Sequence, residues 1–335
     1  MTSLVRLRAV RKALHLLHAI AQRESTFAEY AGHLLLAFRQ IGTTSRSAAI
    51  RRPALEMGRE CAARWKERWP ETRRQLSGNN VLDQVIASYA AQRLGIVAED
   101  IRADVRRVVA ACTTRELLFF DPSIEEPPDD VPEDCECGCT NARGRRRCGT
   151  CGQHLSARSR WSLWYYALTS TYFCERNDVP LRVRLVDVVH QLARLRPYPT
   201  PDAPDYYEGI YAITHLVYTL NGYGCSRLSR RLLREEYRFL KVAMRWALAQ
   251  KEADTIGEII DSLLALGLDE SDELLVAGRA FLLETQCDDG GWGDEGGDEY
   301  AYFHTVWTAI DGLRDYSWRG TMTIDRTLWR ALALP

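Results

Sequence analysis

The sequence lacks any run of about 18 apolar residues, the length that a membrane-spanning helix requires. Its N-terminus lacks an apolar secretory segment followed by a small-residue cleavage site. The 44 basic and 45 acidic residues leave a net charge of −1, so the chain as a whole has no general attraction for nucleic acid or an anionic membrane. We therefore expect a cytoplasmic protein with no membrane partner, and we do not expect a nucleic-acid partner.

The sequence also lacks the short motifs that identify common reactions. It contains no nucleophile elbow, phosphate-binding loop or dinucleotide fingerprint, and no recognisable pair of catalytic carboxylates. Convincing runs of alternating polar and apolar residues, typical of half-buried strands, are missing too. These absences argue against a β-rich fold and leave the type of reaction open.

Apolar residues at helical spacing fill most of the chain, beginning with Val10, Leu14 and Leu17. The same spacing predicts further helices at 27–41, 54–68, 81–93, 98–111, 159–174, 181–195, 207–221, 229–249, 253–266, 270–286 and 302–315. Short polar connections between such helices favour antiparallel hairpins. The sequence therefore predicts an all-α fold built from helical hairpins.

An acidic, proline-rich segment interrupts the helical pattern. Residues 121–136 hold eight acids and no base, and their prolines cannot donate backbone hydrogen bonds, so no regular structure is expected there. We predict three units: an N-terminal helical bundle at 1–120, the acidic linker with a zinc ribbon at 121–158, and a helical-hairpin domain at 159–335.

Five of the ten cysteines crowd into residues 135–151. In a chain without a secretory segment, such clustering favours a metal site over disulfides. Two close pairs offer four soft ligands, and four thiolates would close the coordination shell, so the metal would be structural. The first pair has a third cysteine beside it, so one of Cys135, Cys137 and Cys139 is not a ligand. We take Cys139 as that residue and leave the choice among the three open. We predict that zinc is held by Cys135, Cys137, Cys148 and Cys151.

From Cys137 onward this segment resembles the RanBP2-type zinc fingers, with the spacing Cys-x3-Asn-x6-Cys-x2-Cys and Asn141 in place. It departs from them in its first pair, which has one intervening residue. The resemblance implies an RNA-binding or ubiquitin-binding module, with phosphate contacts from Arg143, Arg145, Arg146 and Arg147. The alternative, which we favour, is a ribbon that packs on its own helical neighbours.

Two stretches of the C-terminal half resemble each other. Each runs from an acid and tyrosines to His-x-Val-aromatic-Thr, and the histidines, His215 and His304, lie 89 residues apart, close to two units of a helical-hairpin repeat. Equivalent positions in a ring of hairpins face one cavity. We therefore expect a catalytic site at these histidines, with Asp205 and Asp298 as the nearest acids and His190 as a third candidate histidine.

Two imidazoles flanked by carboxylates could hold a second, catalytic metal of unknown identity. Seven tyrosines and tryptophans near the histidines would suit a cavity for an apolar or aromatic ligand. The competing interpretation is that each histidine is an ordinary hydrogen-bonded core residue among packed aromatic rings.

Gln286-Cys-Asp-Asp-Gly-Gly-Trp292 resembles the Gln-x-x-Asp-Gly-Gly-Trp element of the α/α-toroid proteins, the terpene cyclases and their relatives. The stretch around His304 is similar to one in protein prenyltransferase β subunits, where the histidine binds catalytic zinc. The resemblance implies a partial α/α toroid over about 160–315, in which Gln286 and Trp292 join helix ends. The cyclases' Asp-x-Asp-Asp motif is missing, and so is the prenyltransferase Asp-x-Cys pair upstream of His304.

Three functional hypotheses follow from these patterns. The first is a metal-dependent, biosynthetic-type enzyme that acts on a small apolar or aromatic molecule in a helical-repeat cavity. The second is a zinc-ribbon binding or regulatory protein that docks a protein or nucleic acid. The third is a noncatalytic toroid that only sequesters an apolar ligand. A terpene cyclase-like or prenyltransferase-like activity is a weaker alternative form of the first.

Overall fold

A computed structural model of the chain describes residues 3–78, 80–128, 133–135, 137–141, 148–152, 159–293, 297–322 and 332. Within these ranges the chain is 67% helical, and its regular structure is almost entirely helix. Its one small sheet pairs β1 (Glu133–Asp134) with β2 (Thr140–Asn141) in antiparallel orientation. The prediction of an all-α fold is confirmed.

The helices follow the predicted periodicity closely. Their bounds are α1 Ser3–Gln22, α2 Glu24–Thr44, α3 Ala48–Glu67, α4 Trp69–Thr72, η1 Arg73–Gln75, α5 Val81–Arg93, α6 Glu99–Ala111, α7 Thr114–Leu118, α8 Arg160–Arg176, α9 Leu185–His190, α10 Leu192–Leu195, α11 Tyr206–Asn221, α12 Arg234–Gln250, α13 Ala253–Ala265, α14 Glu273–Glu284 and α15 Glu299–Leu313.

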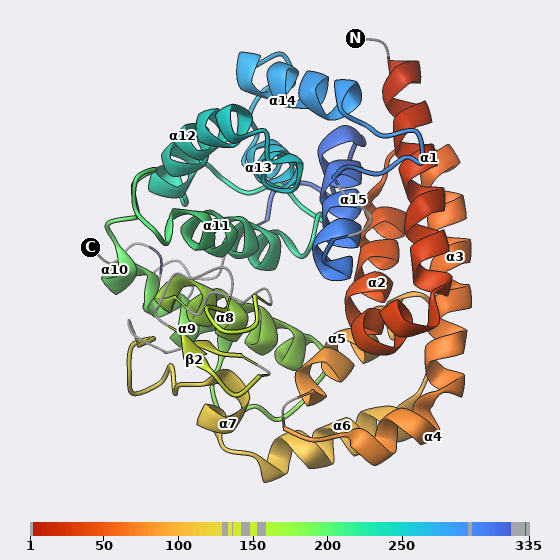
Figure 1. The fold of residues 1–335 in the computed structure, drawn as a ribbon, viewed down its shortest axis with the longest axis vertical. Helices are drawn as coiled ribbons and strands as arrows, with labels where there is room; N and C mark the ends of the chain where they lie inside the picture. The colour runs from red at the N-terminus through yellow and green to blue at the C-terminus, as the bar shows by residue number, and fades with distance from the viewer. Residues whose placement is uncertain are drawn as a thin grey trace.

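Six helices contact one another in turn and close a circuit: α2, α5, α8, α11, α13 and α15, with α15 returning to α2 (Figure 1). Other helices pack against this circuit from outside. Helix α1 lies on α15 and α2, α3 lies on α2 and α5, α9 lies on α8, and α12 and α14 cover α13.

The pattern of buried residues differs between the helices of the circuit and the helices packed outside it. In the outer helix α12 the buried residues form one stripe, at Glu236, Phe239, Leu240, Ala243, Met244 and Ala247. In the inner helix α13 every residue from Thr255 to Ala265 is buried. A helix buried on one side needs only one apolar stripe, whereas a helix buried all round must also place its polar side chains inside the protein. The polar side chains of α13 therefore become candidates for function.

One hydrophobic core extends from Ala9 on α1 to Leu313 on α15 and includes α5, α8 and α11. It crosses the predicted unit boundaries at 120 and 158, which stay predictions. No described helix has the length and apolar character needed to cross a membrane. The cytoplasmic location also stays a prediction.

The Gln286–Trp292 segment joins α1 to the turn between α14 and α15. The Gln286 amide donates to the carbonyl oxygen of Ala9 at 3.0 Å, and the Trp292 indole donates to that of Leu282 at 2.7 Å. Gly290 has a φ of +105°, and a Cβ there would lie 3.0 Å from the Lys12 backbone. The segment thus holds the C-terminal end of α14 against the side of α1.

Candidate active site and cysteine cluster

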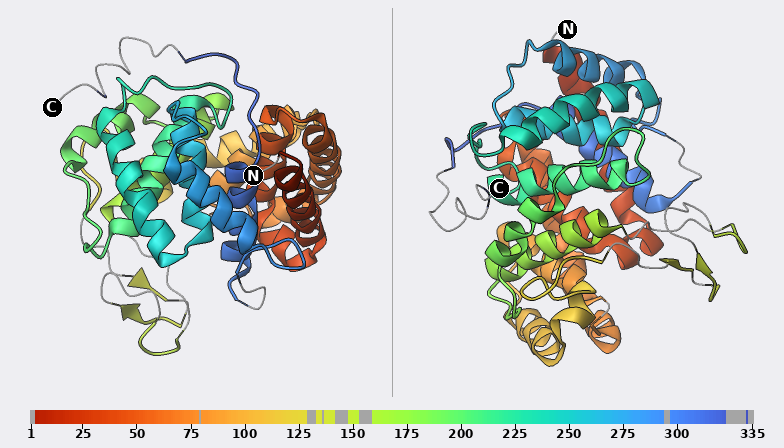
Figure 2. Two further views of the ribbon diagram at one scale, coloured as in Figure 1. Left: turned by 90° about the horizontal axis from the view of Figure 1, so that it is seen from above. Right: turned by 90° about the vertical axis from the view of Figure 1, so that its left-hand side faces the viewer.

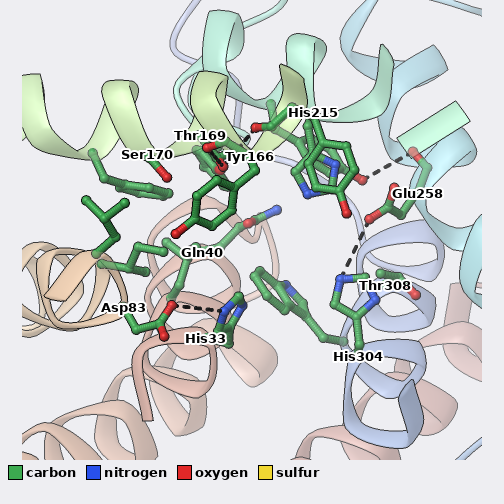
Figure 3. Close-up of a pocket in the computed structure, with 18 of the residues that line it drawn as sticks. His33, Gln40, Asp83, Tyr166, Thr169, Ser170, His215, Glu258, His304 and Thr308 are labelled. Atoms are coloured by element: carbon green, nitrogen blue, oxygen red, sulfur yellow. Dashed lines mark hydrogen bonds and ion pairs between the residues drawn. The ribbon is translucent and has the colours of Figure 1, made fainter. Parts of the chain in front are cut away.

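A cavity of about 310 Å³ lies inside the circuit of helices, and each of the six helices contributes to its wall (Figure 3). Both predicted histidines line it, His215 from α11 and His304 from α15. The wall includes seven tyrosine, phenylalanine and tryptophan side chains, those of Tyr165, Tyr166, Phe173, Tyr218, Tyr223, Tyr300 and Trp307. A mostly apolar cavity with a few polar groups is the usual form of a small-molecule site.

His304 has a carboxylate near each ring nitrogen. Its Nδ1 lies 2.9 Å from Oδ1 of Asp254, and its Nε2 lies 3.8 Å from Oε1 of Glu258. The His304 side chain is only 8% exposed. Burial alone would lower the pKa of His304, but the charge and hydrogen bond of Asp254, with smaller contributions from Glu258 and Asp311, together outweigh burial and raise that pKa to about 9. His304 is therefore an imidazolium at neutral pH.

Three donors hold Asp254 in place. Its Oδ1 accepts from His304 and, at 2.8 Å, from the Thr308 hydroxyl, while its Oδ2 accepts from the Tyr211 hydroxyl. A carboxylate with this many donors has little freedom to turn. Asp254 therefore fixes the orientation of the His304 ring.

The close approach of α13 and α15 depends on glycine. A Cβ on Gly257 would lie 2.4 Å from the carbonyl oxygen of Thr308, which is closer than real Cβ atoms come to such an atom. Asp254, Glu258 and Asp261 follow the i, i+4, i+7 spacing of one face of α13. Gly257 lets the backbone of α13 come close enough for that face to reach His304.

Glu258 lies at the deep end of the cavity, with its side chain 1% exposed. Its Oε2 accepts a hydrogen bond of 2.5 Å from the Thr214 hydroxyl. Burial raises the pKa of Glu258 to about 8, against the lowering effect of the His304 charge and with a smaller raising contribution from Asp254. At neutral pH Glu258 is therefore largely a neutral carboxylic acid beside an imidazolium.

His215 has the opposite environment. Its Nδ1 lies 2.8 Å from the carbonyl oxygen of Tyr211, an acceptor, so Nδ1 carries the proton and Nε2 keeps its lone pair. Its ring packs on the rings of Tyr165 and Tyr211, at centroid distances of 5.0 and 5.8 Å. Burial, followed by the charges of His304 and His33, lowers the pKa of His215 to about 3. His215 is a neutral imidazole at physiological pH.

Tyr211 links the two histidines. Its ring stacks on His215 and also on His304, at a centroid distance of 6.0 Å from the latter. The structure therefore brings both predicted histidines to one cavity and to one shared aromatic neighbour.

The two predicted acids do not join the histidines. Asp298 is exposed and caps α15, accepting a hydrogen bond from the backbone N–H of Ala301 at 3.1 Å. Asp205 stands at the N-cap position of α11 and does not line the cavity. His190 is exposed at the end of α9. The carboxylates that meet His304 are those of Asp254 and Glu258.

The sequence held a signal for these missed acids. Asp254, Glu258 and Asp261 share one face of an otherwise apolar helix, a pattern that costs free energy unless partners are present. His304, Thr308 and Asp311 repeat the same spacing on α15. Two polar stripes on apolar helices predict that the stripes face each other.

The other end of the cavity holds His33 from α2 and Asp83 from α5, which Figure 3 shows opposite His304 and Glu258. Nε2 of His33 and Oδ1 of Asp83 are 4.0 Å apart, and their side chains are 28% and 47% exposed. These side chains are much more accessible than His304 and Glu258. The cavity therefore opens at His33 and Asp83.

The cavity is a poor fit for the predicted second metal. Across the described ranges, three or more metal-ligating side chains converge only at the cysteine cluster. Both nitrogens of His304 are directed at carboxylates, and a protonated imidazole has no lone pair to offer a metal. The arrangement suits proton transfer better than metal coordination.

The four predicted cysteines do come together. All four sulfur atoms, of Cys135, Cys137, Cys148 and Cys151, lie within 4.8 Å of one another. The closest pairs are 3.4 and 3.7 Å apart. Four sulfurs bonded to zinc at about 2.3 Å would be about 3.8 Å apart, so the geometry and the soft donors suit such an ion.

Cys139 lies beside this cluster, with its sulfur 2.9 Å from the Thr150 hydroxyl. Asn141 supports the turn, because its side chain accepts from the backbone N–H of Gly149 at 2.9 Å. Strands β1 and β2 project from the helical body (Figure 2), and Cys135 and Cys148 form a small core apart from the main one. The four arginines predicted to contact phosphates, within 143–147, lie outside the described residues.

Comparisons with known proteins add no relative. No family model matches the chain, and searches of curated proteins and of solved structures found no significant match.

Proposed function

We propose that the protein is an enzyme that catalyses proton transfer on a small, largely apolar or aromatic molecule held in the cavity. The observation that carries this proposal is the buried His304–Asp254 pair, with Nε2 of His304 directed into an aromatic cavity beside Glu258. Groups whose environments drive their pKa values apart are typical of acid–base sites. His304 and His215 form such a set.

In this proposal His304 is the general acid. Its imidazolium donates the Nε2 proton to the substrate, and Asp254 stabilises the positive charge and fixes the ring. Asp254 makes no contact with the substrate and is a positioning residue. Glu258, lying 3.8 Å from Nε2, then passes its own proton to His304, and the carboxylate so formed takes up the proton that the substrate releases, which restores both groups.

His215 has a different role. A neutral imidazole with a free lone pair on Nε2 accepts a hydrogen bond from a hydroxyl or N–H group of the substrate. The tyrosine rings around it exclude water, which strengthens polar contacts inside the cavity.

We also propose an α/α-toroid-like fold and a structural zinc ion, as the sequence analysis predicted. The closed circuit of helices and the Gln286–Trp292 joint support an α/α-toroid-like arrangement. The sulfur geometry supports a structural zinc ion at the cysteine cluster. A terpene cyclase-like or prenyltransferase-like activity is less favoured, because a diphosphate would meet neither lysine nor arginine among the described residues that line the cavity.

A binding or regulatory role remains the second candidate. The observation that favours it is the projection of the cysteine cluster from the helical body, where a protein or nucleic acid would have access (Figure 2).

The enzyme proposal is tested by following solvent deuterium incorporation into a panel of small aromatic and alkenyl compounds with mass spectrometry. His304→Gln should slow turnover at least about 100-fold, the usual contribution of a general acid. Asp205→Asn and Asp298→Asn are matched controls and should stay within about twofold of the unaltered protein. Unchanged turnover in the His304→Gln variant would contradict the proposal.

A further inference from the structure

The cavity lining is richer in carboxyl groups than in cations, and its one cation among the described residues, His304, is already paired with Asp254. The described lining residues include the carboxylic groups of Asp83, Glu258 and Asp311 but no lysine or arginine. Two buried arginines, Arg39 and Arg314, are not among these lining residues. Arg314 donates to Asp311 at 2.5 Å, and Arg39 donates to the sulfur of Cys225 at 3.6 Å. An anionic ligand in the cavity would therefore lose its hydration and meet only the His304 charge, which Asp254 already compensates.

The aromatic wall adds to this preference. The face of an aromatic ring is the negative end of its quadrupole and attracts cations, whether of lysine, arginine or a ligand. Tyr300 occupies a central place in the wall, with its ring 5.3 Å from that of His33 and 5.3 Å from that of His304. Seven aromatic side chains line the cavity.

Among the described residues, Asp83 at the mouth has no lysine or arginine partner. Within the described chain its one ion-pair neighbour is His33, at 4.0 Å. Burial lowers the pKa of His33 to about 4, so His33 is neutral at pH 7. Burial raises the pKa of Asp83 to about 6, so its carboxyl group is mostly ionised at that pH. The mouth therefore carries a negative charge next to His33, whose ring centroid lies 5.3 Å from that of Tyr300.

The deep end already has its own cation. His304 is protonated, and Asp254 compensates its charge at 2.9 Å. A second positive charge is therefore unfavourable beside His304 and favourable beside Asp83.

We propose that the cavity binds an organic cation, an ammonium group on a small apolar or aromatic body, with the ammonium group at Asp83 and Tyr300 and the body extending toward His304. The placement of the apolar part of the ligand toward His304, as the reacting group, rests on the proposed function. The preference for a cation rests only on the lining residues.

The test compares three probes of similar size by isothermal titration calorimetry on the full chain at pH 7. These are benzyltrimethylammonium, its neutral carbon analogue neopentylbenzene, and benzoate. We expect the ammonium probe to bind at least about tenfold more tightly than the neutral analogue, as cation–π and ion-pair contacts predict, and benzoate to bind most weakly. Equal or tighter binding of the neutral or anionic probe overturns the proposal, and so does failure of the ammonium probe to bind.

Variants at the mouth locate the site. Asp83→Asn should reduce the preference for the ammonium probe about tenfold while leaving the neutral analogue unaffected, and Asp83→Glu, which keeps the charge, should retain it. Tyr300→Leu should also reduce the preference for the ammonium probe, and this reduction does not depend on Asp83. An unchanged preference in both Asp83→Asn and Tyr300→Leu overturns the placement.

The same titration separates this inference from the enzyme proposal. His304→Gln should keep the Asp83-dependent preference while losing turnover. If the preference holds and the unaltered protein shows no turnover, the enzyme proposal fails alone. If turnover depends on His304 and the neutral analogue binds best, the cation inference fails alone.

Discussion

Helices α11 and α15 carry the same short pattern, yet their histidines have opposite proton behaviour. In both helices an acid and tyrosines precede His-x-Val-aromatic-Thr. His304 on α15 has a pKa raised to about 9, and His215 on α11 has a pKa lowered to about 3. The difference comes from the neighbours of each helix, because the pattern itself is shared.

Helix α13 supplies that difference. It contacts both α11 and α15, and its Asp254 carboxylate lies 2.9 Å from His304. His215 receives a carbonyl oxygen and tyrosine rings instead. The repeated sequence pattern thus places His215 and His304 in one cavity. Helix α13 gives a carboxylate partner to His304 and not to His215, so only His304 is protonated.

The largest expected effect comes from separating α13 and α15. In Gly257→Ala the new Cβ would meet the carbonyl oxygen of Thr308 at 2.4 Å, and because that atom is backbone, the helices must move apart. We expect the free energy of unfolding to fall by about 3 kcal/mol or more. Urea denaturation measures this fall. Val276→Ala, at an exposed position of α14, is the control and should change it by less than about 0.5 kcal/mol. A loss of similar size in both variants would show that the close approach is not critical.

The next effect comes from removing the carboxylate that distinguishes the two histidines. In Asp254→Asn the His304 imidazolium loses its partner, so burial dominates and the pKa of His304 should fall from about 9 to below its ordinary value of 6.5. The free energy of unfolding at pH 7 should fall by about 2 kcal/mol. An NMR titration of the histidine ring protons reports the pKa. Asp298→Asn, at the α15 cap, should leave it unchanged. A His304 pKa that stays near 9 without Asp254 would refute the pairing.

The two histidines should also affect opposite sides of the stability–pH curve. His215 binds its proton less readily in the folded protein (pKa about 3) than in the unfolded chain (6.5), so its contribution is present above pH 6.5 and is lost as pH falls toward 3. His304 binds its proton more readily when folded, so its contribution is present below pH 6.5 and is lost as pH rises through 9.

Each side of the curve is expected to change by about 2 kcal/mol. His215→Phe should therefore flatten the acid side and His304→Gln the alkaline side, measured as the free energy of unfolding in denaturant at pH 4, 7 and 9.5. Flattening of the same side by both variants would contradict the assignment.

The smallest effect on the cavity should come from the cysteine cluster, which has a core of its own. Elemental analysis should find one equivalent of zinc in the unaltered protein and none in Cys148→Ser. The titration of His304 should be the same in both. A shifted His304 pKa in Cys148→Ser would show that the cluster and the cavity are coupled.

Much of the fold could be predicted from the sequence. The helices predicted at 81–93 and 253–266 appear as α5 Val81–Arg93 and α13 Ala253–Ala265. The helix predicted at 181–195 begins later, at Leu185, and is interrupted at Gln191, whose side chain donates to the carbonyl oxygens of Pro122 and Glu125. Helical spacing could not reveal that tertiary contact.

The candidate site could be predicted in part. The repeated pattern identified His215 and His304, but the acids closest to them in sequence, Asp205 and Asp298, occupy N-cap positions. The acids that meet His304 come from a helix about 50 residues earlier. Spacing shows that Asp254 and Glu258 share a polar face of α13 and that His304, Thr308 and Asp311 share one on α15, but the distances between these side chains depend on how closely the two helices pack, which spacing does not give.

The central claim is that one cavity holds a protonated and a neutral histidine at the same pH. An NMR titration of the unaltered protein, labelled with ¹³C and ¹⁵N at histidine, tests it most directly. The structure predicts that His304 titrates near pH 9 and that His215 stays neutral down to about pH 4. Titration of both rings near pH 6.5 would contradict it.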